Sequence, residues 1–187
     1  MDTKTALLNS AENSARSYGY DGFSYADLAA DVGIRKASIH HHFPTKATLA
    51  VSLMKRYNED LTDKLMQIFA ENDTGARQLN EVFKHYRAAL KDGNSLCLCI
   101  AFSISRDHLD QEIVTELSAF RKNSIKWLTA IFELGQTDGT ISNVMNPAVE
   151  AKSCLAVLEG AQLAARAEKD TDIFDAAIQT FLMRIKT

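Results

Sequence analysis

Apolar residues recur at three- and four-residue spacing along most of the chain, which is the period of amphipathic α-helices. Strict alternation of apolar and polar residues, the pattern of a half-buried strand, is hard to find. Together with the glycines, prolines and capping residues, the spacing predicts helices over about 3–18, 25–31, 36–43, 46–70, 75–91, 96–105, 111–135, 148–168 and 173–185. We therefore expect an all-α fold of about nine helices.

The segment 19–46 has the pattern of two short helices joined by a tight turn. Ser24 followed by Asp27 is a capping pair for the first of these helices. Gly33 supplies the turn, and Pro44 ends the second helix because proline cannot continue a helix interior. This helix-turn-helix pattern, with basic and imidazole groups on the second helix, is typical of a helix that enters a DNA groove. A plain three-helix core with solvated charges is the alternative.

The second of these helices has an inner and an outer face. On a wheel of about 100° per residue, Ile39 and Phe43 fall together and are expected to face the core. His42 lies near Ile39 on the same wheel, so we expect it to pack inward. The outer face then carries Ala37, Ser38, His40 and His41. Successive histidines diverge by about 100° and cannot chelate one ion, so no metal site is expected here.

The outer face and the first turn contain the groups that suit a DNA groove. Arg35 and Lys36 lie in the first turn, where they reach a base edge or a phosphate. Ala37 is small enough to let the backbone approach base edges or to contact a thymine methyl group. We predict base contacts by Lys36, Ala37 and His41.

Two helix N-termini are predicted to bind phosphates. Lys46 lies in the first turn of its helix, where a cation opposes the helix dipole, but the free N–H groups there bind anions. Lysine and these N–H groups together suit a phosphate. Ser24 and Tyr25 are placed in the same way at the preceding N-terminus.

These residues resemble the helix-turn-helix of TetR/AcrR-type transcriptional repressors. The family pattern has glycine and an aromatic residue, a Ser/Thr cap, a short apolar helix and a glycine turn. A small residue, an aliphatic residue, an aromatic residue, any residue and then His-Phe-Pro-x-Lys follow. The chain reads Gly22-Phe23-Ser24, Leu28-Ala29, Gly33, and then Ser38 to Lys46 as SIHHHFPTK. The match covers about residues 5–50; beyond it, only the length and the all-helical layout are similar.

His40 departs from this pattern. The family usually has tyrosine there, and that tyrosine commonly contacts a phosphate. Histidine also donates a hydrogen bond, and it binds phosphate better when it is charged. We therefore expect a phosphate contact by His40 that depends on pH in the range where histidine titrates.

The resemblance also implies a domain layout. It places a DNA-binding domain at 1–47 and a ligand-binding and dimerisation domain at 48–187, with the last two long helices pairing in a homodimer. The sequence agrees, since small residues recur every four positions in the helix of 148–168 and allow close helix approach. The predicted interface residues are Ala156, Gly160, Ala164, Phe174, Ile178 and Phe181. Ordinary core packing is the alternative. A two-fold dimer predicts a palindromic double-stranded DNA operator.

In such regulators a small effector binds within the C-terminal body and lowers operator affinity. The aromatic residues of the body are the candidate pocket, although each is also an ordinary core residue. They are Phe69, Phe83, Tyr86, Phe102, Phe120 and Trp127. The sequence does not identify the effector.

Cys97 and Cys99 are separated by one residue. In a helix they would point to nearly opposite sides, which disfavours a shared metal ion or a mutual disulfide. Small buried core residues are the first interpretation. Because some family members sense oxidants or electrophiles through cysteine, a reactive sensor thiol is the alternative.

Charge supports the division into a head and a body. The chain has a formal net charge of −3. Residues 1–58 contain 7 Lys and Arg and 5 acids (+2), and the other residues contain 14 and 19 (−5). An acidic body with a mildly basic head suits a protein that presents one end to DNA.

Other classes of function receive less support from the sequence. The N-terminal MDTKTALLNS lacks the features of a signal peptide, and no apolar run approaches the roughly 20 residues needed to span a bilayer. We expect a cytoplasmic protein without cofactor or membrane partner. The sequence contains no Gly-rich phosphate loop and no HExxH pair, so we expect no enzyme. A helical ligand-binding or interaction protein that has weakened or lost DNA binding is the second candidate.

Overall fold

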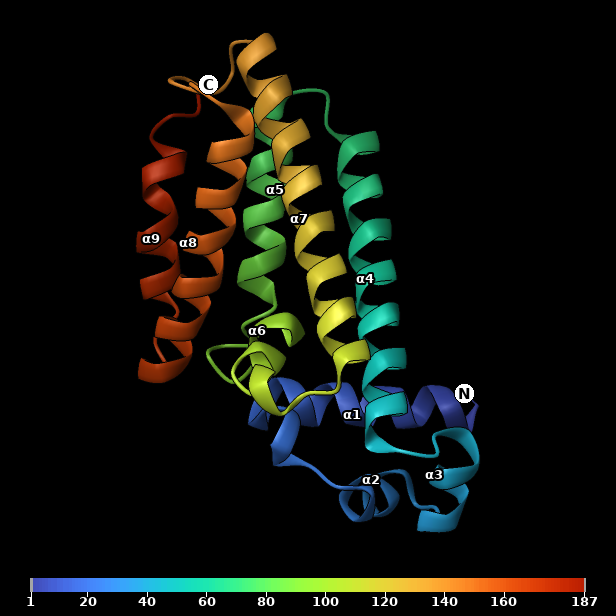
Figure 1. The fold of residues 1–187 in the computed structure, drawn as a ribbon. Helices are drawn as coiled ribbons and strands as arrows, with labels where there is room; N and C mark the ends of the chain where they lie inside the picture. The colour runs from blue at the N-terminus through green and yellow to red at the C-terminus, as the bar shows by residue number, and fades with distance from the viewer. Residues whose placement is uncertain (1, 187) are drawn as a thin grey trace. The chain divides into compact units, whose positions relative to one another are not determined.

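The computed structural model describes residues 2–186 (Figure 1). Over these residues the chain forms nine α-helices and two short 3-10 helices, which confirms the predicted all-α fold class. The elements are α1 (Thr3–Tyr18), η1 (Tyr20–Gly22), α2 (Tyr25–Val32), α3 (Lys36–His42), α4 (Lys46–Glu71), α5 (Gly75–Ala88), α6 (Leu98–Ser103), η2 (Arg106–His108), α7 (Gln111–Thr137), α8 (Pro147–Glu168) and α9 (Asp172–Leu182).

The chain forms two compact units, and two of the three boundaries between them fall inside long helices. The first unit combines the residues up to 59 with 98–120, and the second combines 60–97 with the residues from 121 onward. The first boundary lies within α4 and the third within α7. The functional division at 47/48 remains a prediction.

In the first unit, α1 packs against α2, α6 and η1. Leu7, Leu28 and Ile39 are fully buried at the centre of this packing. Arg56 of α4 joins α1 from the other side: its two terminal nitrogens donate to Asn9 and Glu12, each at 2.8 Å. The head is therefore held by a small apolar core together with the largely buried ion pairs of Glu12 with Arg56 and Arg16.

In the second unit, α8 and α9 lie side by side and both contact α5 (Figure 1). Gln162 of α8 is a fully buried polar residue at this junction. Its side chain accepts from the Cys97 amide at 3.0 Å and donates to the Tyr86 carbonyl at 2.8 Å. Because an unpaired amide is costly in a core, these two bonds fix α8 relative to α5 and the segment before α6.

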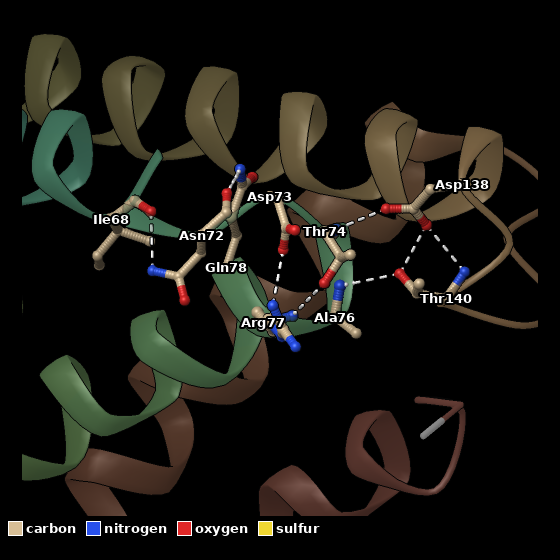
Figure 2. A network of polar contacts seen from close by, with 10 residues as sticks. Ile68, Asn72, Asp73, Thr74, Ala76, Arg77, Gln78, Asp138 and Thr140 are labelled. Atoms are coloured by element: carbon tan, nitrogen blue, oxygen red, sulfur yellow. Dashed lines mark hydrogen bonds and ion pairs between the residues drawn. The ribbon is translucent and has the colours of Figure 1, made fainter. Parts of the chain in front are cut away.

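A polar network covers the N-terminus of α5 (Figure 2). The Asp138 carboxylate accepts from the Gly75 amide at 2.8 Å, and the Thr140 hydroxyl accepts from the Ala76 amide at 3.1 Å. Burial would raise the pKa of Asp138, but hydrogen bonds from Thr140 and Gly75 outweigh burial and lower it. An anion at a helix N-terminus also matches the helix dipole. The network therefore anchors α5 to the end of α7.

The predicted helix boundaries agree with the structure at most ends, and the main differences are in the sixth, seventh and last helices. The sixth helix begins at Leu98, so Cys97 precedes it. The seventh passes Gly135 and continues to Thr137. The last ends at Leu182 because Arg184 and Lys186 pair with the backbone of 140–142 instead of continuing the helix. Within residues 2–186 there is no helix long and apolar enough to cross a membrane.

Candidate nucleic-acid interface

Both ends of α2 are fixed by local hydrogen bonds. The Asp27 carboxylate accepts from the Ser24 amide and hydroxyl, both at 2.7 Å, and these bonds lower the pKa of Asp27. At the other end of α2, Gly33 has a left-handed φ of 74° and its amide bonds the Ala29 carbonyl. The predicted capping pair and glycine turn are confirmed, and together they set the direction in which α3 leaves α2.

α3 presents its polar side chains outward. Ile39 is fully buried and Phe43 is 2% exposed, which confirms the predicted inner face. The exposed residues of and beside α3 are Arg35, Lys36, Ala37, Ser38, His40, His41 and His42. They form a continuous patch of cationic, imidazole and small groups, which we call the α3 face. Such a surface fits the width and the hydrogen-bonding edges of a DNA major groove.

The inward packing expected for His42 is wrong. His42 is exposed, and its ring lies edge-on to His41 with centroids 5.5 Å apart. Three helical residues cover about 300°, so His42 lies about 60° from Ile39 rather than above it. α3 also ends at His42, and Phe43 in extended backbone takes the inner position instead.

Tyr25 and Lys46, two of the predicted phosphate contacts, have internal partners. The Tyr25 side chain is buried, and its hydroxyl lies 2.9 Å from the Phe43 carbonyl and 2.6 Å from the Thr45 carbonyl. Burial raises the pKa of Tyr25 to about 12, so the hydroxyl keeps its proton. The hydroxyl donates to the turn between α3 and α4. It therefore points inward, whereas a phosphate contact would need it to point outward.

The Lys46 ammonium is also directed into the head. It donates to the Phe23 carbonyl at 2.6 Å and lies over the Phe23 and Tyr20 rings, 4.3 and 4.7 Å from their centroids. Burial lowers the pKa of Lys46, against the carboxylates of Asp21 and Asp27, which raise it. These aromatic partners were not predicted, although Tyr20 and Phe23 shortly before α2 were the available signal in the sequence.

We expect Lys46→Met to destabilise the protein by about 1 kcal/mol or more, because it removes a charged hydrogen bond and two cation–π contacts. Urea unfolding followed by circular dichroism measures the change. Lys36→Met is the matched control, since Lys36 is exposed on α3 and its replacement should change stability by less than about 0.5 kcal/mol. Equal stabilities of the two variants would show that the aromatic contacts contribute nothing.

His40 is exposed, but one of its ring nitrogens is engaged. Nδ1 lies 3.1 Å from the Pro44 carbonyl, and the ring packs edge-on against Tyr25 with centroids 5.0 Å apart. His40 and Tyr25 thus both bond carbonyls of the same short turn, 43–45. The orientation of the imidazole is set by this turn.

The six candidate pocket aromatics divide between the two units, and each contacts another aromatic ring of its own unit. In the first unit, Phe102 packs against Tyr20, and Phe120 stacks on Tyr57. In the second unit, the pairs are Phe69 with Trp127, Phe83 with Phe181, and Tyr86 with His85. Their role in effector binding remains a prediction.

The predicted dimer residues divide into two sets. Ala156, Gly160 and Ala164 are exposed along α8, and a Cβ atom built on Gly160 would meet nothing within 4 Å. In contrast, Phe174, Ile178 and Phe181 of α9 are buried within the chain, with at most 7% of their surface exposed. These three side chains pack into the chain's own core, and their contact with a partner remains a prediction.

Cys97 and Cys99 are both buried, at 4% and 0% exposure. The Cys97 amide is bonded to Gln162, and Cys99 lies in α6 of the first unit. This burial agrees with the interpretation of both cysteines as core residues. Buried thiols are also seldom reactive. A sensor role for either thiol remains a prediction. Among residues 2–186, no group of three His, Cys, Asp or Glu side chains is arranged to hold a metal ion.

Comparison with known proteins gives the same result for both parts of the chain. Residues 7–53 match the family model of bacterial regulatory proteins of the tetR family, and residues 75–181 match that of the tetracyclin repressor-like C-terminal domain. A crystal structure of a TetR-family transcriptional regulator from Agrobacterium tumefaciens superposes with a TM-score of 0.93. It is 30% identical in sequence, over 98% of this chain and 97% of that one.

Two curated relatives are also similar. The transcriptional regulator CymR of Pseudomonas putida is 28% identical over 111 residues, which is 57% of this chain and 53% of CymR. The transcriptional repressor DhaR of a Mycobacterium species is 23% identical over 159 residues, 84% of this chain and 79% of DhaR. The chain thus spans about half the length of CymR and most of DhaR.

Proposed function

The chain belongs to the TetR family of bacterial regulatory proteins, and we propose that it is a homodimeric repressor that binds a palindromic DNA operator through α3. The observation that carries this proposal is the α3 face. It is exposed, rich in donors and cations, and held by a capped α2 and a glycine turn. The similarity to DhaR, which is named a repressor, favours repression over activation.

The roles of the head residues follow from their orientation. Lys36, Ala37 and His41 would contact bases, because all three are exposed on the α3 face. Arg35, Ser38 and His40 would contact phosphates at the edges of the groove, whereas Ser24, whose amide and hydroxyl donate to Asp27, would contribute by capping α2. Tyr25 and Lys46 would contribute by holding the turn between α3 and α4, since their polar atoms face that turn and Phe23.

The exposed stripe of α8 would form the dimer interface. Ala156, Gly160 and Ala164 leave room for a partner helix to approach closely, and Leu163 between them is 45% exposed. A two-fold axis along this stripe would give two copies of α3 facing successive turns of DNA. A small effector bound in the C-terminal body would then release the operator by favouring a different spacing of the two heads.

Selection of bound fragments from random DNA, followed by affinity measurements at several salt concentrations, tests this proposal. We expect enrichment of one inverted repeat, and a loss of roughly 10³-fold in affinity between about 50 and 200 mM salt. Ala37→Glu is the control, because it places a carboxylate on the α3 face without disturbing a contact in the core, and it should abolish enrichment.

A different result would favour the second candidate function, a ligand-binding or interaction protein of the same fold. That candidate predicts no enriched fragment, and affinity for DNA that is weak and the same for wild type and Ala37→Glu.

A further inference from the structure

The hydrogen bond between His40 and Pro44 determines which nitrogen of the ring carries a proton. A backbone carbonyl only accepts, so Nδ1, 3.1 Å from the Pro44 carbonyl, must be the donor. A neutral imidazole has one N–H group, and here Nδ1 carries it. The other nitrogen, Nε2, then has a lone pair and no hydrogen.

This tautomer cannot bind a phosphate in its neutral form. Phosphate oxygens are acceptors, and an Nε2 lone pair gives them no hydrogen bond. Protonation supplies an Nε2–H group and a positive charge together, while Nδ1 keeps its bond to Pro44. The imidazolium then makes a charge-assisted hydrogen bond, the stronger kind, with an anionic oxygen.

We propose that His40 couples operator binding to proton uptake: its imidazole binds a DNA phosphate only as the imidazolium, so each protomer takes up a proton on binding. This inference rests on the proposed function and specifies the chemistry of one contact within it. Operator affinity would then rise as pH falls through the range in which histidine titrates.

The titratable groups near His40 come from α2, α3 and the start of α4. From α2 it meets Tyr25, which is uncharged, and Asp27 of α2 is held by Ser24. On its own helix Lys36 lies one turn before it and His41 beside it, and at the start of α4 the Lys46 ammonium is held at Phe23. In the turn 43–45, the Pro44 carbonyl accepts from Nδ1, and the Phe43 and Thr45 carbonyls accept from Tyr25. A DNA phosphate would therefore be the anion that draws the proton onto Nε2.

The test counts protons. Calorimetric titration of the full-length protein with a duplex carrying the selected operator, in two buffers of different ionisation enthalpy near about pH 7.5, gives the number taken up. We expect wild type to take up about one proton per protomer more than His40→Gln, whose side-chain amide donates at every pH. As pH rises from about 6 to 8, operator affinity should fall more steeply for wild type than for His40→Gln. The difference should be up to about tenfold per pH unit for each protomer.

His108→Gln is the matched control, because His108 is also exposed in the first unit but lies outside α2 and α3; it should leave the proton count unchanged. Nitrogen-15 spectra of the free protein supply a second measurement, and they should show neutral His40 with its hydrogen on Nδ1. Equal proton counts in wild type and His40→Gln, or a hydrogen on Nε2 of the free neutral ring, would overturn the inference while leaving DNA binding intact. If no duplex binds at any pH, the proposed function fails as well.

Discussion

Replacing Gly75 with alanine is expected to destabilise the protein by about 3 kcal/mol or more. Gly75 opens α5 against α7, and a Cβ atom there would lie closer to the Gly135 backbone and the Ile131 carbonyl than real Cβ atoms approach. These obstacles are backbone atoms of a helix, so no change of rotamer removes them. α5 would have to move away from α7, which also strains the bond from the Gly75 amide to Asp138. Thermal and urea unfolding measure the loss.

Two further variants test this explanation. Thr137→Ala is the control, since Thr137 is exposed at the same end of α7 and bonds only the carbonyl one turn earlier; its effect should stay below about 0.5 kcal/mol. Gly135→Ala meets the side chain of Ile141 instead of backbone. Ile141→Ala should therefore cost less in the Gly135→Ala background than in wild type. It should not relieve Gly75→Ala. Similar stability of Gly75→Ala and Thr137→Ala would contradict the close helix crossing.

This crossing shows why the sequence predicts the helices better than their packing. Periodic apolar residues and local capping signals predicted nine helices, because both depend on residues three or four positions apart. No such local pattern reveals that Gly135 packs against α5. In the sequence this glycine indicates the end of a helix, whereas in the structure α7 continues past it; its backbone lies against Gly75, 60 residues earlier, and Ile141 fills the space that a Cβ atom on Gly135 would need.

The head shows the same limit for side-chain roles. Ser24 and Asp27 cap α2 as predicted, since that interaction is local. Lys46 is 23 residues from its Phe23 partner, and the hydroxyl of Tyr25 reaches across 18 residues to the Phe43 carbonyl. The local sequence around a lysine or tyrosine at a helix N-terminus is the same whether its polar group faces a phosphate or points into the protein. Only tertiary structure distinguishes the two orientations.

Tertiary structure also decides which side chains of α8 and α9 face outward. The second prediction with a large effect follows from that orientation. Small residues every four positions predicted a partner-facing stripe on α8, and the family resemblance added Phe174, Ile178 and Phe181 of α9. The structure buries the aromatic residues of α9 and leaves Ala156, Gly160 and Ala164 exposed. Exposed small residues have no packing role within the chain, which makes their replacement a sensitive test of a partner.

If α8 forms the proposed dimer interface, Gly160→Glu is expected to convert the dimer to monomer and to lower operator affinity by about 100-fold or more, because one head then binds one half-site without the other. Within the chain the substitution is harmless, since a Cβ atom on Gly160 meets nothing within 4 Å. A buried, unpaired carboxylate between two copies of α8 is not harmless. Sedimentation equilibrium and operator titration measure the two effects on the same samples, with Ala70→Glu, an exposed position on α4, as the control.

The milder substitution Gly160→Ala separates the two interpretations by the sign of its effect. If α8 faced water, alanine would stabilise the helix by roughly 0.5 to 1 kcal/mol, because glycine loses more backbone entropy on folding. If a partner helix lies against Gly160, the added methyl group collides with it and the dimer dissociates more readily. We expect the second result, with the loss of stability growing as the protein is diluted. A stabilised Gly160→Ala variant together with a dimeric Gly160→Glu variant would place the interface on another surface.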